Sequence, residues 1–127
     1  MRKVLSGALI ASIGVLLLAG CGSYLEINGI AKKNRAAMPR ITPGITPDAV
    51  VRIMEGEPYL TELFKGKEGE QILVYKYITR ATNNYNNLTD DDLTPFIFVN
   101  NFLDGWGWSY LETASKKYEF VVKVKNR

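Results

Sequence analysis

The sequence predicts an α+β fold in which one or two short N-terminal helices pack, as a two-layer structure, on an antiparallel sheet of three to four strands. Apolar residues recur with a helical period over residues 46–54 and with a period of two beyond residue 58, whereas residues 22–40 have no clean period. Mostly short polar turns separate the strand-like segments, as in antiparallel sheets. The chain has 127 residues, 46% of them hydrophobic, which suits a single domain with one small core.

The most clearly marked helix covers residues 46–54. Thr46 suits an N-cap, Pro47 suits the first helical position, and Pro58 prevents the helix from continuing. Gly56 is expected to adopt the left-handed conformation that ends the helix. The apolar face of this helix is formed by Val50, Ile53 and Met54.

Five segments have a strand-like pattern and are the candidates for the sheet of three to four strands: residues 59–64, 71–79, 95–99, 102–108 and Tyr118–Lys125. The pair Asn100–Asn101 is expected to form a tight turn, because Asn tolerates positive φ. Residues 80–94 contain four Asn, three consecutive Asp and no apolar period, which predicts a long exposed loop.

The first 21 residues have the features of an export signal. Arg2 and Lys3 precede an apolar run over residues 4–18, which is shorter than the roughly 20 residues of a membrane-spanning helix. The ending Leu18-Ala19-Gly20-Cys21 resembles the lipobox of bacterial lipoproteins, in which the cysteine thiol receives a diacylglyceryl group and becomes the new N-terminus. The resemblance implies lipidation of Cys21 and attachment to a membrane through its acyl chains.

These features divide the chain into a lipoprotein signal peptide (1–20), a lipidated tether with a short helix (21–40) and an α+β domain (41–127). Gly22 follows the cysteine where lipoproteins kept in the inner membrane of enteric bacteria commonly carry Asp. By this resemblance, we expect an outer-membrane lipid anchor with the domain facing the periplasm.

The composition excludes several classes of site. With no His, a Ser-His-Asp triad, a Cys-His pair and a His-ligated zinc are all impossible, and a single Cys excludes an intrachain disulfide. Without Arg2 and Lys3, 14 basic residues face 13 acidic ones, for a charge of +1. The basic residues are scattered, so no nucleic-acid binding is expected.

No metal, cofactor or catalytic site is predicted either. Residues 90–92 are three Asp, but they lack the spacing of a calcium-binding loop, which favours a solvated loop or a helix cap. Two carboxylate pairs, Glu68 with Glu70 and Asp104 with Glu112, lie in predicted turns without a visible cleft. We therefore expect a protein that is not an enzyme.

Several segments carry a resemblance to a known family. Gly44-Ile45-Thr46, Gly56-Glu57-Pro58 and Val74-Tyr75-Lys76-Tyr77 resemble the small lipoprotein domain of the BamE (SmpA/OmlA) family. Pro95-Phe96-Ile97-Phe98 and Gly105-Trp106-Gly107-Trp108 are similar to a group of uncharacterised Gram-negative lipoproteins with the same layout. The resemblance covers residues 41–111 and implies a two-layer α+β fold with a binding or scaffolding role.

A pair of tryptophans offers a candidate contact surface. Trp106 and Trp108 would share one face of a strand with Phe102 and Asp104, either as core residues or as an exposed surface for a partner. The predicted partner-binding residues are Phe102, Trp106, Trp108 and Tyr110.

The function expected from the sequence is that of a lipid-anchored, non-enzymatic binding or scaffold protein with an envelope protein as its partner. Its role would lie in envelope maintenance or outer-membrane protein assembly. Two alternatives stay open: an inhibitor of a secreted hydrolase, since the layout resembles that of β-lactamase-inhibitor proteins, or a small-ligand or cell-wall binding module.

Overall fold

The computed structural model describes residues 23–82 and 88–122 of the chain. The predicted signal peptide and Cys21 lie outside the described residues. The elements in chain order are α2 (Ser23–Ala37), η1 (Met38–Arg40), α3 (Pro47–Met54), β1 (Leu60–Lys65), β2 (Gln71–Ile78), η3 (Asp90–Asp92), β3 (Leu93–Val99), β4 (Phe102–Trp106) and α4 (Trp108–Tyr118).

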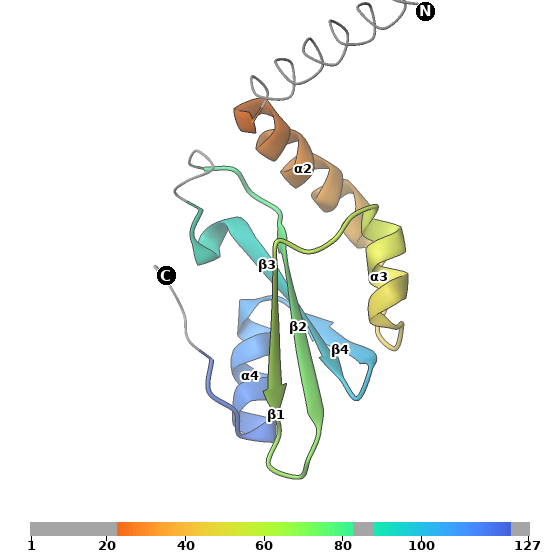
Figure 1. Cartoon of the computed structure of the whole chain (residues 1–127), viewed down its shortest axis with the longest axis vertical. Helices are drawn as coiled ribbons and strands as arrows, with labels where there is room; N and C mark the ends of the chain where they lie inside the picture. Colours follow the sequence, from red (N-terminus) through yellow and green to blue (C-terminus); the bar gives the residue numbers. More distant parts are fainter. Residues whose placement is uncertain (1–22, 83–87, 123–127) are drawn as a thin grey trace, which may run out of the picture.

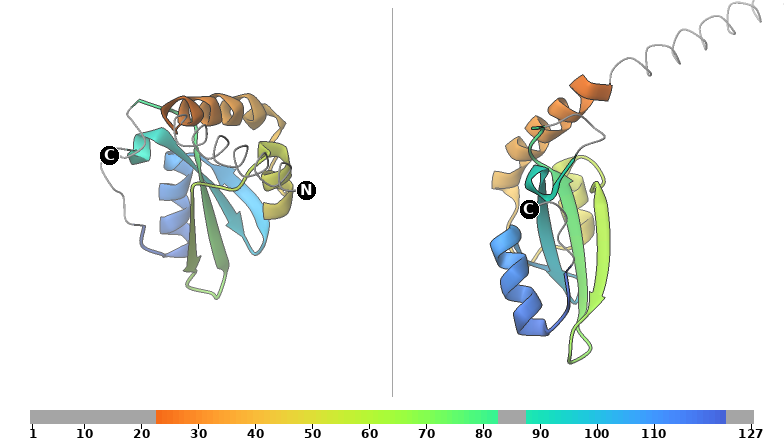
Figure 2. Two further views of the ribbon diagram at one scale, coloured as in Figure 1. Left: turned by 45° about the horizontal axis from the view of Figure 1, so that its top comes forward. Right: turned by 90° about the vertical axis from the view of Figure 1, so that its left-hand side faces the viewer.

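The four strands form one antiparallel sheet whose strand order follows the chain order, β1-β2-β3-β4. α3 lies on one face of the sheet and α4 on the other, while α2 crosses one end of the sheet (Figures 1 and 2). Asn34 of α2 donates to the Ile78 carbonyl at 2.8 Å, at the end of β2. The α+β class, with helices packed on an antiparallel sheet of four strands, is confirmed, and α4 adds helical cover on the second face.

The helix predicted at residues 46–54 is α3. The Thr46 hydroxyl accepts a hydrogen bond from the Ala49 N–H at 3.3 Å, and Pro47 opens the helix. The expected stop at Gly56 is wrong by one residue, because Glu55 takes the left-handed conformation with φ of 55°. With the reversal at Glu55, the Gly56 N–H reaches the Val51 carbonyl at 3.2 Å and closes the helix end.

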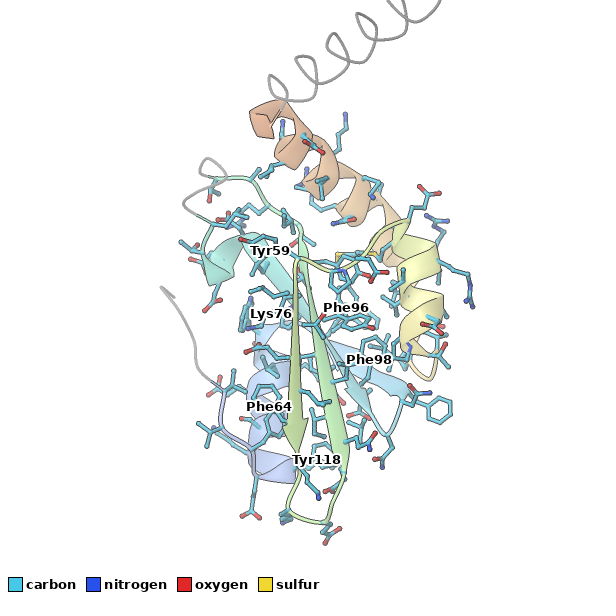
Figure 3. The ribbon with its side chains drawn as sticks, viewed as in Figure 1. Tyr59, Phe64, Lys76, Phe96, Phe98 and Tyr118 are labelled. Carbon is cyan, nitrogen blue, oxygen red and sulfur yellow. The ribbon has the colours of Figure 1, made fainter. Side chains whose placement is uncertain are left out.

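Each face of the sheet has its own core, because side chains alternate along a strand. On the α3 side the buried residues are Ala37, Ile41, Val50, Met54, Tyr77, Phe96, Phe98 and Leu103. On the α4 side they are Ile72, Val74, Ile97, Leu111, Ala114 and Phe120. Figure 3 shows Phe96 and Phe98 on the α3 side of the sheet and Phe64 and Lys76 on the α4 side. A third cluster, Ile27, Ala31, Ile78 and Leu93, joins α2 to the end of the sheet.

The strand predicted at Tyr118–Lys125 is wrong over the described residues. Tyr118 is the last residue of α4, residues 119–122 are not in a strand, and residues 123–125 lie outside the described part of the chain. The strand expected at residues 102–108 also stops at Trp106, where Gly107 with φ of 99° turns the chain into α4.

The hairpin turn at Asn100–Asn101 is confirmed. Both residues have positive φ, 49° and 75°, which Asn accepts more readily than most residues. The Asn100 side chain also accepts a hydrogen bond from the Gln71 N–H at 3.0 Å, which fixes the turn to the neighbouring strand.

Candidate functional site

The four predicted partner-binding residues, Phe102, Trp106, Trp108 and Tyr110, do not form one surface. Phe102 opposes Val99 and Trp106 opposes Phe96, and these two β3 residues face opposite sides of the sheet. The cause is a register shift in β3–β4 that leaves Asp104 as an extra residue. The expectation of one shared strand face is therefore wrong, and Phe102, 55% exposed, is the one of the four on the open surface.

Trp106 and Trp108 take part in packing on different sides of the sheet. The Trp106 ring lies 6.1 Å from that of Phe96, against the α3-side core. Trp108 is the first residue of α4, and its indole N–H donates to the Leu93 carbonyl at 2.9 Å and the Asp90 carbonyl at 3.0 Å. These bonds join the start of α4 to the start of β3.

Tyr110 closes over a glycine of β4. A Cβ atom on Gly105 would lie 2.6 Å from the Tyr110 ring, so the close approach requires glycine at this position. The Tyr110 hydroxyl donates to the Asp104 carboxylate at 2.5 Å. Burial, with this hydrogen bond and the charge of Asp104, raises the pKa of Tyr110 to about 12.

A buried ion pair lies beneath α4. Lys76 Nζ is 2.5 Å from Glu62 Oε1 and 5.2 Å from the centre of the Trp108 ring. The Lys76 side chain is only 4% exposed, whereas that of Glu62 is 33% exposed. Lys76 lies on the same face of β2 as Ile72, Val74 and Ile78. A cation among apolar residues of one strand face is the sequence feature that could have indicated this site.

The acidic run at residues 90–92 is a structural turn. Asp92 is fully buried and completes a capping box with Thr89, so the helix-cap interpretation holds for Asp92. Thr82 donates to Asp92 Oδ1 through its hydroxyl at 2.5 Å and through its N–H at 3.2 Å. Burial opposes the charge of Asp92, but the hydrogen bonds from Thr82 and Thr89 outweigh it and lower the pKa.

The exposed loop predicted at residues 80–94 is therefore wrong at three places. Asp90 and Asp92 are buried, and β3 already begins at Leu93. The Thr-x-x-Asp spacing of Thr89 and Asp92 was the sequence signal for the cap.

A cavity of about 440 Å³ opens where the end of α2 meets the start of β3. Its lining includes two cationic side chains, Arg35 and Arg80, one carboxylate, Asp91, and the Trp108 ring. The Arg35 guanidinium is held by the Thr79 carbonyl at 2.7 Å. Guanidinium groups beside an aromatic wall can bind a small carboxylate or phosphate, although Asp91 offsets part of their charge.

β1 is an edge strand with exposed apolar side chains. Leu63 is 72% exposed and Leu60 is 45% exposed, and Tyr59, just before the strand, is 39% exposed. An apolar edge of this kind is a common place for protein contacts.

The described residues contain no group of three or more Cys, Asp or Glu side chains that could hold a metal ion. Within the same residues, no helix combines the length and apolar character needed to cross a membrane.

Comparison with known proteins places the chain in a family without a described function. The family model with the description "Protein of unknown function (DUF3192)" matches residues 26–113, which is more than two thirds of the chain and runs from α2 into α4. No curated protein and no solved structure matches the chain. The resemblance to the BamE family stays a prediction. The chain belongs to the DUF3192 family.

Proposed function

We propose that this protein is a lipid-anchored, non-enzymatic binding or scaffold protein of the outer membrane, with its domain facing the periplasm. Its role would be in envelope maintenance or outer-membrane protein assembly. The observation that carries the proposal is the sequence of residues 1–21, a short apolar run that ends in Leu18-Ala19-Gly20-Cys21. The folded domain supports it, because α2 is already packed on the end of the sheet at Ile27, six residues after the proposed lipid attachment site.

A binding role also fits the surface of the domain. Phe102 on β4 and Leu63 on β1 are large apolar side chains that stay exposed after the two cores are filled. Aromatic side chains such as Phe are enriched in protein interfaces, and exposed apolar surface commonly marks an interaction site.

The anchor is tested by metabolic labelling with palmitate and by separation of inner and outer membranes on a density gradient. We expect the wild-type chain to incorporate label and to sediment with the outer membrane. Cys21→Ala should incorporate none, because the chain has no second cysteine. Equal labelling of the variant, or no labelling of the wild type, would contradict the proposal.

The partner is tested by crosslinking and affinity capture from intact envelopes. Phe102→Ala should lower the recovery of an envelope protein partner at least several-fold, since it truncates an exposed aromatic side chain. Val121→Ala, at another exposed apolar position, is the matched control and should leave recovery unchanged. Recovery of the same proteins with Phe102→Ala would remove Phe102 from the contact surface.

The cavity favours one alternative function, the binding of a small ligand or cell-wall fragment. Its volume of about 440 Å³ lies within the range of small-molecule sites, and Arg35 and Arg80 supply cationic groups on its wall. Soluble peptidoglycan fragments should then raise the melting temperature of the wild type but not that of Arg80→Gln. No shift with the wild type would exclude this alternative for these ligands.

A further inference from the structure

We propose that residues 32–40 dock on anionic phospholipid headgroups beside the lipid anchor. The surface consists of the side chains of Lys32, Lys33, Arg35 and Arg40, here called the basic face. The inference rests on the proposed lipid anchor, and it adds a second, electrostatic contact that would fix how the domain lies on the membrane.

The four cations are concentrated in one short part of the chain. Residues 23–40 contain these four cations and one acid, Glu26, for a net charge of +3. Residues 41–122 contain seven cations and twelve acids, for a net charge of −5. A negatively charged surface therefore attracts the α2 end of the domain and repels the remainder.

The packing of α2 leaves these cations accessible. Ile27, Ala31 and Asn34 are buried against the end of the sheet, whereas Lys32, Lys33, Arg35 and Arg40 are all exposed. α2 forms one outer end of the domain, so this surface is not covered by another described element (Figures 1 and 2).

Within the described residues, no direct ion pair neutralises the basic face, although one acid, Asp91, lines the same cavity as Arg35. Lys33 donates to the Glu55 carbonyl at 2.9 Å, Arg35 to the Thr79 carbonyl at 2.7 Å and Arg40 to the Ile53 carbonyl at 3.3 Å. Carbonyl groups carry no net charge, so these bonds position the cations without cancelling them. No cation of the basic face forms an ion pair with an acidic residue of the described chain, in contrast to Lys67, Lys76 and Lys116.

The position of the anchor makes this weak attraction effective. From Ser23 to Lys32, α2 rises roughly 14 Å along its axis, so a domain that tilts toward the membrane brings the basic face to the membrane surface. Each cation near an anionic surface strengthens binding about five-fold, and a tether turns binding into an intramolecular step.

Acetylation footprinting of the lysines tests the proposal. The mature chain from Cys21 retains every described residue, and its single thiol allows coupling to a maleimide lipid. The coupled protein is placed on vesicles of phosphatidylcholine alone or with 30% phosphatidylglycerol by design, on the order of natural anionic membranes. Acetylation rates of individual lysines are then measured by mass spectrometry.

We expect acetylation of Lys32 and Lys33 to slow about five-fold on the anionic vesicles, whereas Lys116 and Lys117 on α4 keep the same rate on both. High salt should abolish the difference, because the contact is electrostatic. The double variant Arg35→Gln, Arg40→Gln should lose most of the protection without changing either lysine of the basic face. Equal rates of Lys32 and Lys33 on the two vesicle types would overturn the proposal, as would protection that survives the double variant.

The matched control variant is Lys116→Gln, Lys117→Gln, which removes the same amount of charge from α4. This control variant should leave the protection of Lys32 and Lys33 unchanged. Loss of their protection in the control variant would show that protection depends only on the net charge of the protein, and it would overturn the proposal. Because the lipid is coupled chemically, a negative footprint leaves native acylation untouched, and the palmitate experiment judges the anchor separately.

Discussion

The buried pair Lys76–Glu62 allows a quantitative test of the fold beneath α4. Glu62→Leu removes the ion-pair partner of Lys76, whose side chain is 4% exposed and whose Nζ lies 5.2 Å from the centre of the Trp108 ring. Breaking a fully buried pair from one side costs about 3–5 kcal/mol. Glu62 Oε1 is buried, but the Glu62 side chain as a whole is 33% exposed, so we expect the lower end, about 3 kcal/mol.

Lys76→Met should cost less, about 1–2 kcal/mol, because a glutamate that is 33% exposed can regain water. The double variant Glu62→Leu, Lys76→Met replaces both charges with apolar side chains of similar size. It should lie within about 1 kcal/mol of the wild type, which gives a coupling energy of at least about 3 kcal/mol.

The assay is urea unfolding followed by the fluorescence of Trp106 and Trp108, with the four proteins of the cycle measured under the same conditions. Additive losses in the double variant, within about 0.5 kcal/mol, would refute the reasoning, since the pair would then contribute no interaction of its own. A matched cycle on the exposed pair Lys116–Glu112 should give a coupling below about 0.5 kcal/mol.

Three further predictions follow from single contacts. Gly105→Ala should destabilise the fold by about 2 kcal/mol, because the added methyl group clashes with Tyr110. Gly29→Ala should stabilise the fold by up to about 1 kcal/mol, because Gly29 lies in α2 with open space around it. Urea unfolding compares the two variants, and equal effects would contradict this account. The lowered pKa of Asp92 gives stability that is fully present at a pH above its ordinary pKa of 3.8 and is lost as the pH falls through the folded-state pKa. Asp92→Asn should therefore flatten the acid side of the plot of unfolding free energy against pH, and an unchanged plot would contradict this account. The raised pKa of Tyr110 gives stability that is present below pH 10 and is lost as the pH rises toward about 12; Tyr110→Phe should remove one late-titrating phenol from the ultraviolet titration of the folded protein, and loss of an ordinary phenol instead would count against the assignment.

The sequence was sufficient to predict elements whose signals are local. α3 was predicted because Thr46 and Pro47 mark its start, and β2 because apolar residues alternate along it between turns. The reversal at Asn100–Asn101 follows from the residues in the turn itself.

The elements that the sequence did not reveal depend on tertiary contacts. α4 begins with Trp108, a weak helix former after a glycine, so residues 102–108 resembled a continuous strand. Its apolar residues Trp108, Leu111 and Ala114 have helical spacing, but only the second sheet face explains why they are buried.

The candidate site was predicted only in part for a similar reason. Phe102 and Trp106 have the same parity in the sequence, and a register shift in the β3–β4 pairing changes which face each occupies. Such a shift arises from pairing between strands, so spacing within one strand could not predict it.

The strand order of the sheet has a consequence for the route by which the chain folds. Each strand pairs with its neighbours in the chain, so no segment must wait for a distant one before the sheet begins to form. The β3–β4 hairpin has a two-residue turn and should close first, and β1–β2 can close independently of it. Joining the two hairpins requires closure of the longest connection between strands, residues 79–92. The capping box of Asp92 and Thr89 fixes the last turn of this connection, so fewer residues have to be ordered when the loop closes. The rate of sheet assembly should therefore depend on Thr89 and Asp92 more than on any residue of the two hairpin turns.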